Sequence, residues 1–277
     1  MNTLSAIKNI VTMPIGELRS FYAGRNRTNN MGEALKNYIK DVFAGTLHET
    51  NEQTRLIKLG EVFSYQGNQN NPPDMIIKNS DAIEVKKIES PKSTLALNSS
   101  YPKAKIFADS PMITAACREC EVWHEKDILY AIGVVNGNSL KKLFFVYGVD
   151  YAASAEIYER IKSTISSGVS TIPDVEFAQT NELDRVNRVD PLGITYLRIR
   201  GMWGIENPAK VFSHVYTPIN VDFEFTAIIN TNKYNSFPEA DKLALEKIAE
   251  VAITDIRIKT PDNPSVLKQA KLIRFSR

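Results

Sequence analysis

Two short apolar stretches around a polar turn, between Pro72 and Glu89, constrain the fold more than any other part of the chain. The segment reads PPDMIIKNSDAIEVKKIE and predicts strands at 74–78 and 82–89, paired antiparallel through a three-residue turn. The turn is Asn79-Ser80-Asp81, and the facing pairs are Lys78 with Ala82, Ile76 with Glu84, and Asp74 with Lys86. Because side chains alternate along a strand, Met75, Ile77, Ile83 and Val85 form an apolar face, and Asp74, Glu84 and Lys86 share the other. A two-residue turn would break both sets.

Apolar runs and helical periodicities elsewhere predict a mixed sheet flanked by helices. With 277 residues, 43% of them hydrophobic, the chain can bury a sizeable core. We expect further strands at 128–135, 143–149, 194–199 and 223–229, and helices at 31–44, 152–166 and 238–251. Residues 1–61 are expected to be mainly helical. The fold class is therefore α/β or α+β, with a single domain over residues 1–277.

Several features indicate a soluble, cytoplasmic protein without a membrane partner. No apolar run approaches the roughly 20 residues that span a bilayer, and residues 1–13 lack the apolar core of a signal peptide. Two cysteines, Cys117 and Cys120, cannot staple so long a chain, which indicates a reducing compartment. With His124 they also spell C-x-x-C-x-x-x-H, but a structural zinc site needs four ligands. We expect a short helix with partly buried thiols, and leave open whether these residues bind a metal.

The net charge is only +2, but the basic residues are clustered. Five lysines against one acid lie between Val85 and Ile106, and four arginines (185, 188, 198 and 200) against Asp190 lie between Arg185 and Arg200. Local positive fields of this kind suit a polyanion such as DNA. Ordinary solvated surface is the alternative for either cluster.

The charged face of the predicted hairpin fits phosphodiester hydrolysis. Two carboxylates, Asp74 and Glu84, can hold a hard cation such as Mg²⁺, which activates a bound water and neutralises charge at phosphorus. Lys86 beside them can orient or deprotonate the attacking water, or stabilise the pentavalent phosphorane. The alternative is a charged hairpin face with a cross-strand pair between Asp74 and Lys86.

The order of these residues matches a known motif. PPD followed after nine residues by EVK is the PD-(D/E)xK nuclease motif. The strings FSYQGNQNNPPDMIIKNSDAIEVKKIES, LALNSSYPK and YLRIRGMWGIENP resemble type II restriction endonucleases of the NgoPII family. The resemblance extends from about Met31 to Lys210 and is densest from Phe63 to Lys103. It implies a PD-(D/E)xK core fold, Mg²⁺ dependence and recognition of the palindrome GGCC.

The resemblance also implies roles for particular residues. Asp74 and Glu84 would bind the metal, with the Val85 carbonyl as a further ligand, and Lys86 would be the catalytic lysine. Nucleases of this class often carry a Glu on the helix before the PD strand, and Glu33 occupies such a position. The alternative for Glu33 is a first-turn acid favoured by the helix dipole.

Polar loops on either side of the hairpin are candidates for DNA contacts, with ordinary surface loops as the alternative. The candidates after the hairpin are Lys92, Ser93, Asn98, Ser99, Ser100 and Lys103, and those before it are Gln66, Asn68, Gln69 and Asn70. For base recognition we single out Arg198 and Arg200, which point to one face of their predicted strand and carry the paired donors that guanine accepts. Met202 and Trp203 could pack against their stems. Pairing with acids at a dimer interface, or contact with phosphates alone, remains the alternative.

These observations predict a type II restriction endonuclease that hydrolyses both strands of duplex DNA, with residues 62–277 as the catalytic and DNA-recognition core. A palindromic target favours a two-fold homodimer, each subunit serving one half-site. Two rivals stay open: another PD-(D/E)xK nuclease, acting in repair or on junctions, and a DNA-binding module that does not cut. A metabolic enzyme lacks support, because we find no Gly-rich phosphate loop. The cut position, the oligomeric state without DNA and the residue-to-base assignments cannot be read from the sequence.

Overall fold

The fold is known from a computed structural model that describes residues 1–14, 17–18, 31–68, 71–98, 100–180 and 182–277. Its central sheet has the strand order β1-β2-β3-β6-β7-β12-β14-β13, and β5 pairs with β6. The strands are β1 (Phe63–Gln66), β2 (Met75–Ile77), β3 (Ala82–Ile88), β5 (Lys105–Phe107), β6 (Glu125–Asn136), β7 (Ser139–Tyr147), β12 (Glu224–Asn230), β13 (Ala252–Lys259) and β14 (Leu267–Ser276). The β3–β6 and β7–β12 pairs are parallel and the others antiparallel, so the sheet is mixed.

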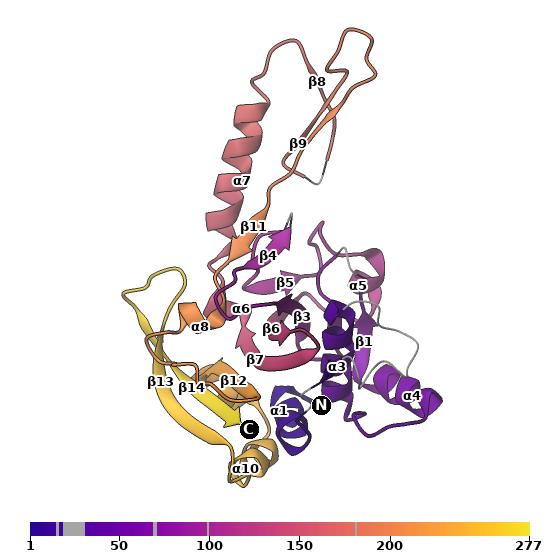
Figure 1. The fold of residues 1–277 in the computed structure, drawn as a ribbon. Helices are drawn as coiled ribbons and strands as arrows, with labels where there is room; N and C mark the ends of the chain where they lie inside the picture. The colour runs from indigo at the N-terminus through magenta and orange to yellow at the C-terminus, as the bar shows by residue number, and fades with distance from the viewer. Residues whose placement is uncertain (15–16, 19–30, 69–70, 99, 181) are drawn as a thin grey trace.

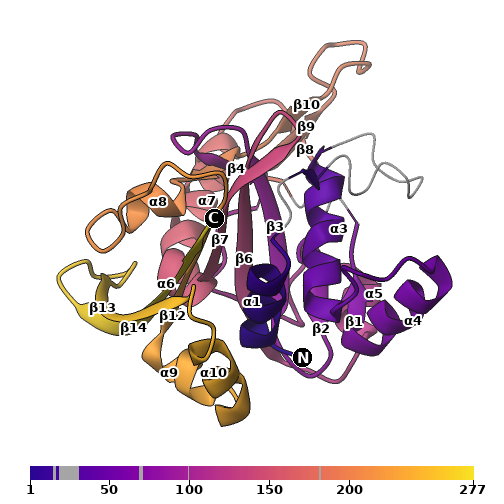
Figure 2. The ribbon, with the colours of Figure 1, turned by 60° about the horizontal axis from the view of Figure 1, so that its bottom comes forward.

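Helices cover both faces of this sheet, as Figures 1 and 2 show. One core cluster packs the sheet against α1 (Thr3–Thr12), α3 (Met31–Ala44), α9 (Thr231–Ser236) and α10 (Glu239–Glu246). The other lies against α5 (Ala115–Glu119), α6 (Gly148–Tyr151) and α8 (Pro208–Val211). With α4 (Glu52–Val62) preceding β1, the described part of the N-terminal segment is mainly helical. The predicted mixed sheet flanked by helices is confirmed.

A narrow arm projects from this body (Figure 1). It consists of α7 (Ala155–Val169) and a small sheet of β8 (Glu176–Phe177), β9 (Asp184–Asn187) and β10 (Leu197–Ile199). A two-stranded sheet of β4 (Leu95–Asn98) and β11 (Trp203–Ile205) lies at its base. None of residues 155–169, all of them described, is buried, which agrees with a helix that stands away from the core.

Several predicted boundaries were wrong for local reasons. The helix expected at 152–166 begins at Ala155, because the short α6 precedes it, and the helix expected at 238–251 ends at Glu246. The strand expected at 194–199 is confined to Leu197–Ile199. The Asp190 carboxylate accepts backbone N–H groups from Leu192, Ile194 and Thr195, so that segment turns instead of extending.

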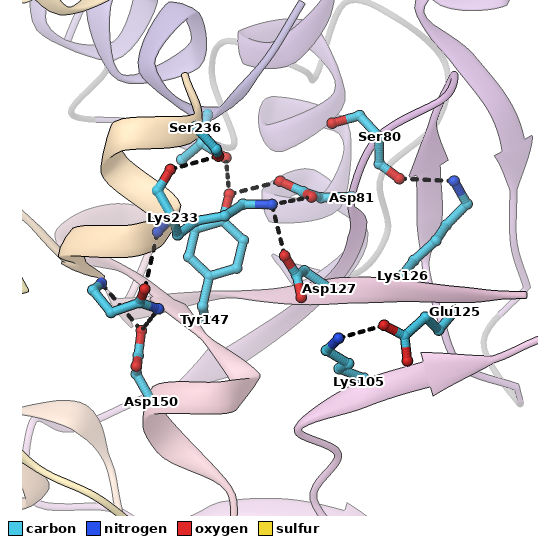
Figure 3. A network of polar contacts seen from close by, with 12 residues as sticks. Ser80, Asp81, Lys105, Glu125, Lys126, Asp127, Tyr147, Asp150, Lys233 and Ser236 are labelled. Carbon is cyan, nitrogen blue, oxygen red and sulfur yellow. Dashed lines mark hydrogen bonds and ion pairs between the residues drawn. The ribbon is translucent and has the colours of Figure 1, made fainter. Parts of the chain in front are cut away.

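A buried polar network fixes the start of β3 to the rest of the body, as Figure 3 shows. Asp81 accepts a hydrogen bond from the Tyr147 hydroxyl at 2.6 Å and pairs with Lys233 of α9, also at 2.6 Å. Lys233 pairs in addition with Asp127 at 2.8 Å. Because Asp81 directly precedes β3, this network positions the strand that carries Glu84 and Lys86.

Candidate active site

The hairpin of β2 and β3 brings the three predicted catalytic residues together. Asp74 directly precedes β2, and its N–H donates to the carbonyl of Ile83 at 3.0 Å. The Val85 N–H donates to Asp74 Oδ2 at 2.7 Å. Lys86 Nζ lies 2.8 Å from Glu84 Oε1. Two carboxylates and one ammonium therefore share one end of the hairpin.

The predicted register of this hairpin was wrong by two residues. Met75 lies opposite Ile83 and Ile76 opposite Ala82, so the turn comprises residues 78–80. Within this turn Asn79 adopts φ 54°. Asp81 lies outside the turn, where its carboxylate accepts a hydrogen bond from Tyr147 and pairs with Lys233. A shift of two preserves the face of every side chain. The apolar and charged faces are therefore as predicted, whereas the expected Asp74–Lys86 pair is replaced by a pair between Lys86 and Glu84.

A cleft of about 920 Å³ opens over these residues. Its walls come from α3, the hairpin, the loop that follows β4, and the base of the arm. The residues that line it include Glu33, Lys36, Asn68, Asp74, Glu84, Val85, Lys86, Ser100, Tyr101, Lys103, Glu182, Arg200 and Met202. Glu33 lies on the first turn of α3, where burial lowers the pKa of Lys40 and the charge of Glu33 opposes that effect.

Burial sets the charge states within the cleft. It raises the pKa of Glu84, and repulsion from Asp74 raises it further, while Lys86 and Lys36 act in the opposite direction. Burial alone would lower the pKa of Lys86, but attraction to Glu84 and Asp74 outweighs it, so this pKa is raised. Lys86 therefore keeps its proton, which favours orientation of water and stabilisation of negative charge over removal of a proton.

The residues present fit a divalent metal ion. Glu84 Oε2 is buried without a hydrogen-bond partner in the described part of the chain. Asp74 and the backbone of Val85 adjoin it, and hard cations prefer such oxygen ligands. Among the described residues, no three His, Cys, Asp or Glu side chains gather into a metal site. Water or substrate oxygens would have to complete the coordination, as is usual for Mg²⁺.

Lys36 is a residue of the site that sequence reasoning missed. Its Nζ lies 2.6 Å from Asp74 Oδ1, and both side chains are largely buried. Lys36 follows Glu33 by three residues on α3, and positions three apart share one face of a helix. That spacing was the available signal, since a helix face that carries Glu33 toward the cleft also carries Lys36.

The predicted DNA contacts divide into two groups. Four of them line the cleft: Asn68, Ser100, Lys103 and Arg200. Burial lowers the pKa of Lys103, and the Lys103 Nζ lies 4.5 Å from the centre of the Tyr101 ring. Gln66, Lys92, Ser93 and Arg198 do not line it. Instead the Ser93 carbonyl accepts a hydrogen bond from Asn207. Gln69, Asn70, Ser99 and the side chain of Asn98 lie outside the described residues.

Arg198 and Arg200 both pair with Glu182, a partner that the sequence did not indicate. The distances to Glu182 Oε1 are 2.5 Å from Arg198 Nη2 and 2.7 Å from Arg200 Nε. The shared partner agrees with the prediction that both arginines point to one face. Trp203 packs edge-on against Tyr101 and Tyr158, and Met202 is largely exposed. Glu182, which lines the cleft, thus pairs with both guanidinium groups, of which only that of Arg200 belongs to a lining residue.

The expected short helix covers only the first part of the C-x-x-C-x-x-x-H segment, because α5 ends at Glu119, before Cys120 and His124. Cys117 is buried in α5, and Cys120 Sγ lies 3.7 Å from the Ser64 hydroxyl. The His124 ring packs edge-on against Phe107. Within the described residues these three side chains do not form a metal cluster.

Comparisons with known proteins extend over nearly the whole chain. A family model described as NgoPII restriction endonuclease matches residues 1–259. The type II restriction enzyme NgoPII of Neisseria gonorrhoeae is 50% identical over 277 residues, a match that covers 99% of each protein. No solved structure matches. In the described part of the chain no helix is long and apolar enough to cross a membrane.

Proposed function

The chain belongs to the NgoPII restriction endonuclease family, and we propose that it hydrolyses both strands of duplex DNA at the palindrome GGCC in an Mg²⁺-dependent reaction. The observation that carries this proposal is the cleft over the hairpin. It joins Asp74, Glu84 and Lys86 with basic residues suited to phosphate. A non-cutting DNA-binding module would not need a buried carboxylate oxygen without a partner beside a protonated lysine.

The proposed chemistry assigns a role to each side chain at the base of the cleft. Asp74 and Glu84, with the carbonyl of Val85, would hold Mg²⁺, which supplies a Lewis acid for the phosphate and for a water. Lys86 donates hydrogen bonds from its ammonium, orienting the attacking water and stabilising charge that develops on the phosphoryl oxygens. Glu33, which lines the cleft on the α3 side, would hold a water or join the metal site.

The loops of the cleft would position the DNA backbone. Ser100 and Asn68 offer short polar groups, and Lys103 offers a cation. Burial lowers the pKa of Lys103, and a bound phosphate would offset this effect by supplying a negative charge beside the ammonium. Phosphate contacts of this kind fix register and carry no base specificity.

Recognition of G·C pairs would fall to the arm. Guanine presents two acceptors in the major groove, which a guanidinium group matches with two donors. Arg200 lines the cleft directly after β10, and Arg198 lies two residues earlier, within that strand. Both are about half-exposed and held by one carboxylate, Glu182. They can therefore exchange that carboxylate for a base edge at small desolvation cost.

A palindromic duplex is cut on both strands most simply by two active sites related by a two-fold axis. We accordingly propose a homodimer on DNA, in which each subunit serves one half-site. We also propose a cytoplasmic location, because the substrate is intracellular DNA.

The test is digestion of a sequenced plasmid by the purified protein with Mg²⁺, followed by mapping of all fragment ends. We expect every end to fall within a GGCC site, with both strands cut. Ends scattered without regard to sequence would favour a repair or junction nuclease, and uncut plasmid at a protein concentration that shifts duplex DNA in a gel would favour a binding module.

A further inference from the structure

Lys36 makes an unusual contact for a residue beside a candidate metal site. Its ammonium reaches from α3 to Asp74 Oδ1 at 2.6 Å, with 12% of the Lys36 side chain and 9% of the Asp74 side chain exposed. The second oxygen, Asp74 Oδ2, accepts the N–H of Val85 at 2.7 Å. Both oxygens of Asp74 therefore already have strong partners.

The neighbouring carboxylate differs in this respect. Glu84 Oε1 pairs with Lys86, whereas Glu84 Oε2 is buried without a hydrogen-bond partner in the described chain. A divalent cation could bind Glu84 Oε2 without displacing any described protein group. A carboxylate oxygen has two lone pairs and can accept more than one partner, but a cation at Oδ1 would lie close to the Lys36 ammonium, so repulsion between the two charges opposes their sharing that oxygen.

We propose that Lys36 is an internal counter-ion of the cation site, which neutralises Asp74 until a divalent cation binds and which the cation must displace from Oδ1. This inference rests on the proposed function. Lysine suits the role, because its ammonium is a point charge on a flexible stem that can withdraw without a change in the backbone. Lys36 lines the cleft, so the released ammonium has solvent and the incoming DNA backbone beside it.

The displacement has a cost that metal affinity should reveal. Bringing a cation to Asp74 first requires that a short and largely buried ion pair be broken, and breaking such pairs is costly. Removing the ammonium should therefore tighten cation binding, by at least about tenfold if the pair contributes as partly buried charge pairs commonly do. A merely structural lysine predicts the reverse, because its loss would disorder Asp74 and weaken binding.

The experiment is calorimetric titration of Ca²⁺ into the full-length protein without DNA, so that the readout is binding and not cleavage. Lys36→Met removes the charge, Lys36→Gln removes it but keeps a donor for Asp74, and Lys36→Arg keeps it. Lys58→Met is the matched control, because Lys58, on α4, pairs with Glu49 and does not line the cleft. We expect tighter binding for the Met and Gln variants, and wild-type affinity for the Arg and Lys58 variants.

Thermal unfolding gives a second readout. Without Lys36 the repulsion between Asp74 and Glu84 is less compensated, so we expect Lys36→Met and Lys36→Gln to melt lower than wild type in EDTA. Excess Ca²⁺ should raise the melting temperature of these variants more than that of wild type, because ligand stabilisation grows as the dissociation constant falls.

The outcomes separate this inference from the proposed function. Equal or weaker Ca²⁺ binding by both uncharged variants, or unfolding that Ca²⁺ does not reverse, would overturn the counter-ion role. If the wild-type protein neither binds Ca²⁺ nor cuts DNA with Mg²⁺, the proposed function itself fails. Wild-type cleavage combined with unchanged affinity of the variants would leave that function intact and reject only the role of Lys36.

Discussion

Glu84 lies where catalysis and stability make opposite demands. Burial and repulsion from Asp74 raise its pKa, so the folded protein is stabilised when this carboxyl is neutral. The substitution Glu84→Gln keeps the shape of the side chain and makes it neutral at every pH. We therefore expect the variant to be more stable than wild type at pH 7 and at the same time unable to cut DNA.

The size of both effects follows from the contacts of Glu84. Its Oε2 is buried without a described partner, and leaving a buried polar group unpaired costs about 1–3 kcal/mol, or more when the group is charged. Glutamine relieves only the charged part of that cost and loses the 2.8 Å pair with Lys86, so we expect a gain of about 1 kcal/mol. That corresponds to about 2 °C in melting temperature for a chain of this size. Loss of a metal ligand should reduce cleavage by about a hundredfold or more.

The pH dependence tests the origin of the gain. An acid with a raised pKa in the folded protein lowers the free energy of unfolding as pH rises above its ordinary value of 4.5. The advantage of Glu84→Gln should therefore vanish below that value and grow toward neutral pH. Urea unfolding at several pH values, in EDTA, measures this, with Glu89→Gln as the control because Glu89 is an exposed carboxylate whose pKa Lys87 lowers. A variant that is less stable at pH 7, or a gain equal at all pH values, would refute the reasoning.

The remaining predictions address the metal, the other catalytic residues, recognition and the scaffold. Asp74→Ala and Lys86→Ala should each reduce plasmid cleavage by about a hundredfold or more while gel-shift binding to target DNA persists; cleavage within about tenfold of wild type would show that the residue is misassigned. EDTA should stop cleavage, and Ca²⁺ should support binding without cutting, so full activity in EDTA would exclude the metal mechanism. Arg198→Ala and Arg200→Ala should weaken binding to a GGCC duplex by about 1–3 kcal/mol and hardly affect a scrambled duplex, measured across salt concentrations; equal losses would indicate phosphate contacts. Lys233→Met should lower the free energy of unfolding by about 3–5 kcal/mol in urea, because it leaves two carboxylates without their shared cation, and a loss below about 1 kcal/mol would contradict the role given to that network.

Local periodicity explains which parts of the fold the sequence could predict. The helix at about 31–44 was predicted, because its apolar positions recur at helical spacing and Gly45, at φ 67°, follows its last residue. The charged face of the hairpin was also predicted, because a shift of the strand register by two residues leaves every side chain on the same face of the sheet. The register itself was not, because it depends on the contacts of Asp81 with Tyr147 and Lys233, residues distant in sequence.

Contacts between distant segments account for what was missed. The strands β13 and β14 went unpredicted because β13 is largely exposed and carries no continuous apolar run. The ion pair between Lys36 and Asp74 joins α3 to the start of the β2–β3 hairpin. The ion pairs of Glu182 with Arg198 and Arg200 join the loop after β8 to β10 and the residue that follows it. Such pairs are defined by tertiary structure, and no local pattern of charges reveals them.

Internal ion pairs neutralise three of the acids that line the cleft, and under the proposed function this arrangement would couple DNA binding to metal binding. Asp74 pairs with Lys36, Glu84 with Lys86, and Glu182 with Arg200. A DNA backbone that enters the cleft offers these cations phosphate oxygens in exchange for carboxylates. Under the proposed function, each exchange would leave a carboxylate less neutralised and so better able to bind a divalent cation, and linkage would then require the cation to strengthen DNA binding by the same factor. Asp74 and Glu84 would thus become stronger metal ligands when a phosphate is bound beside them.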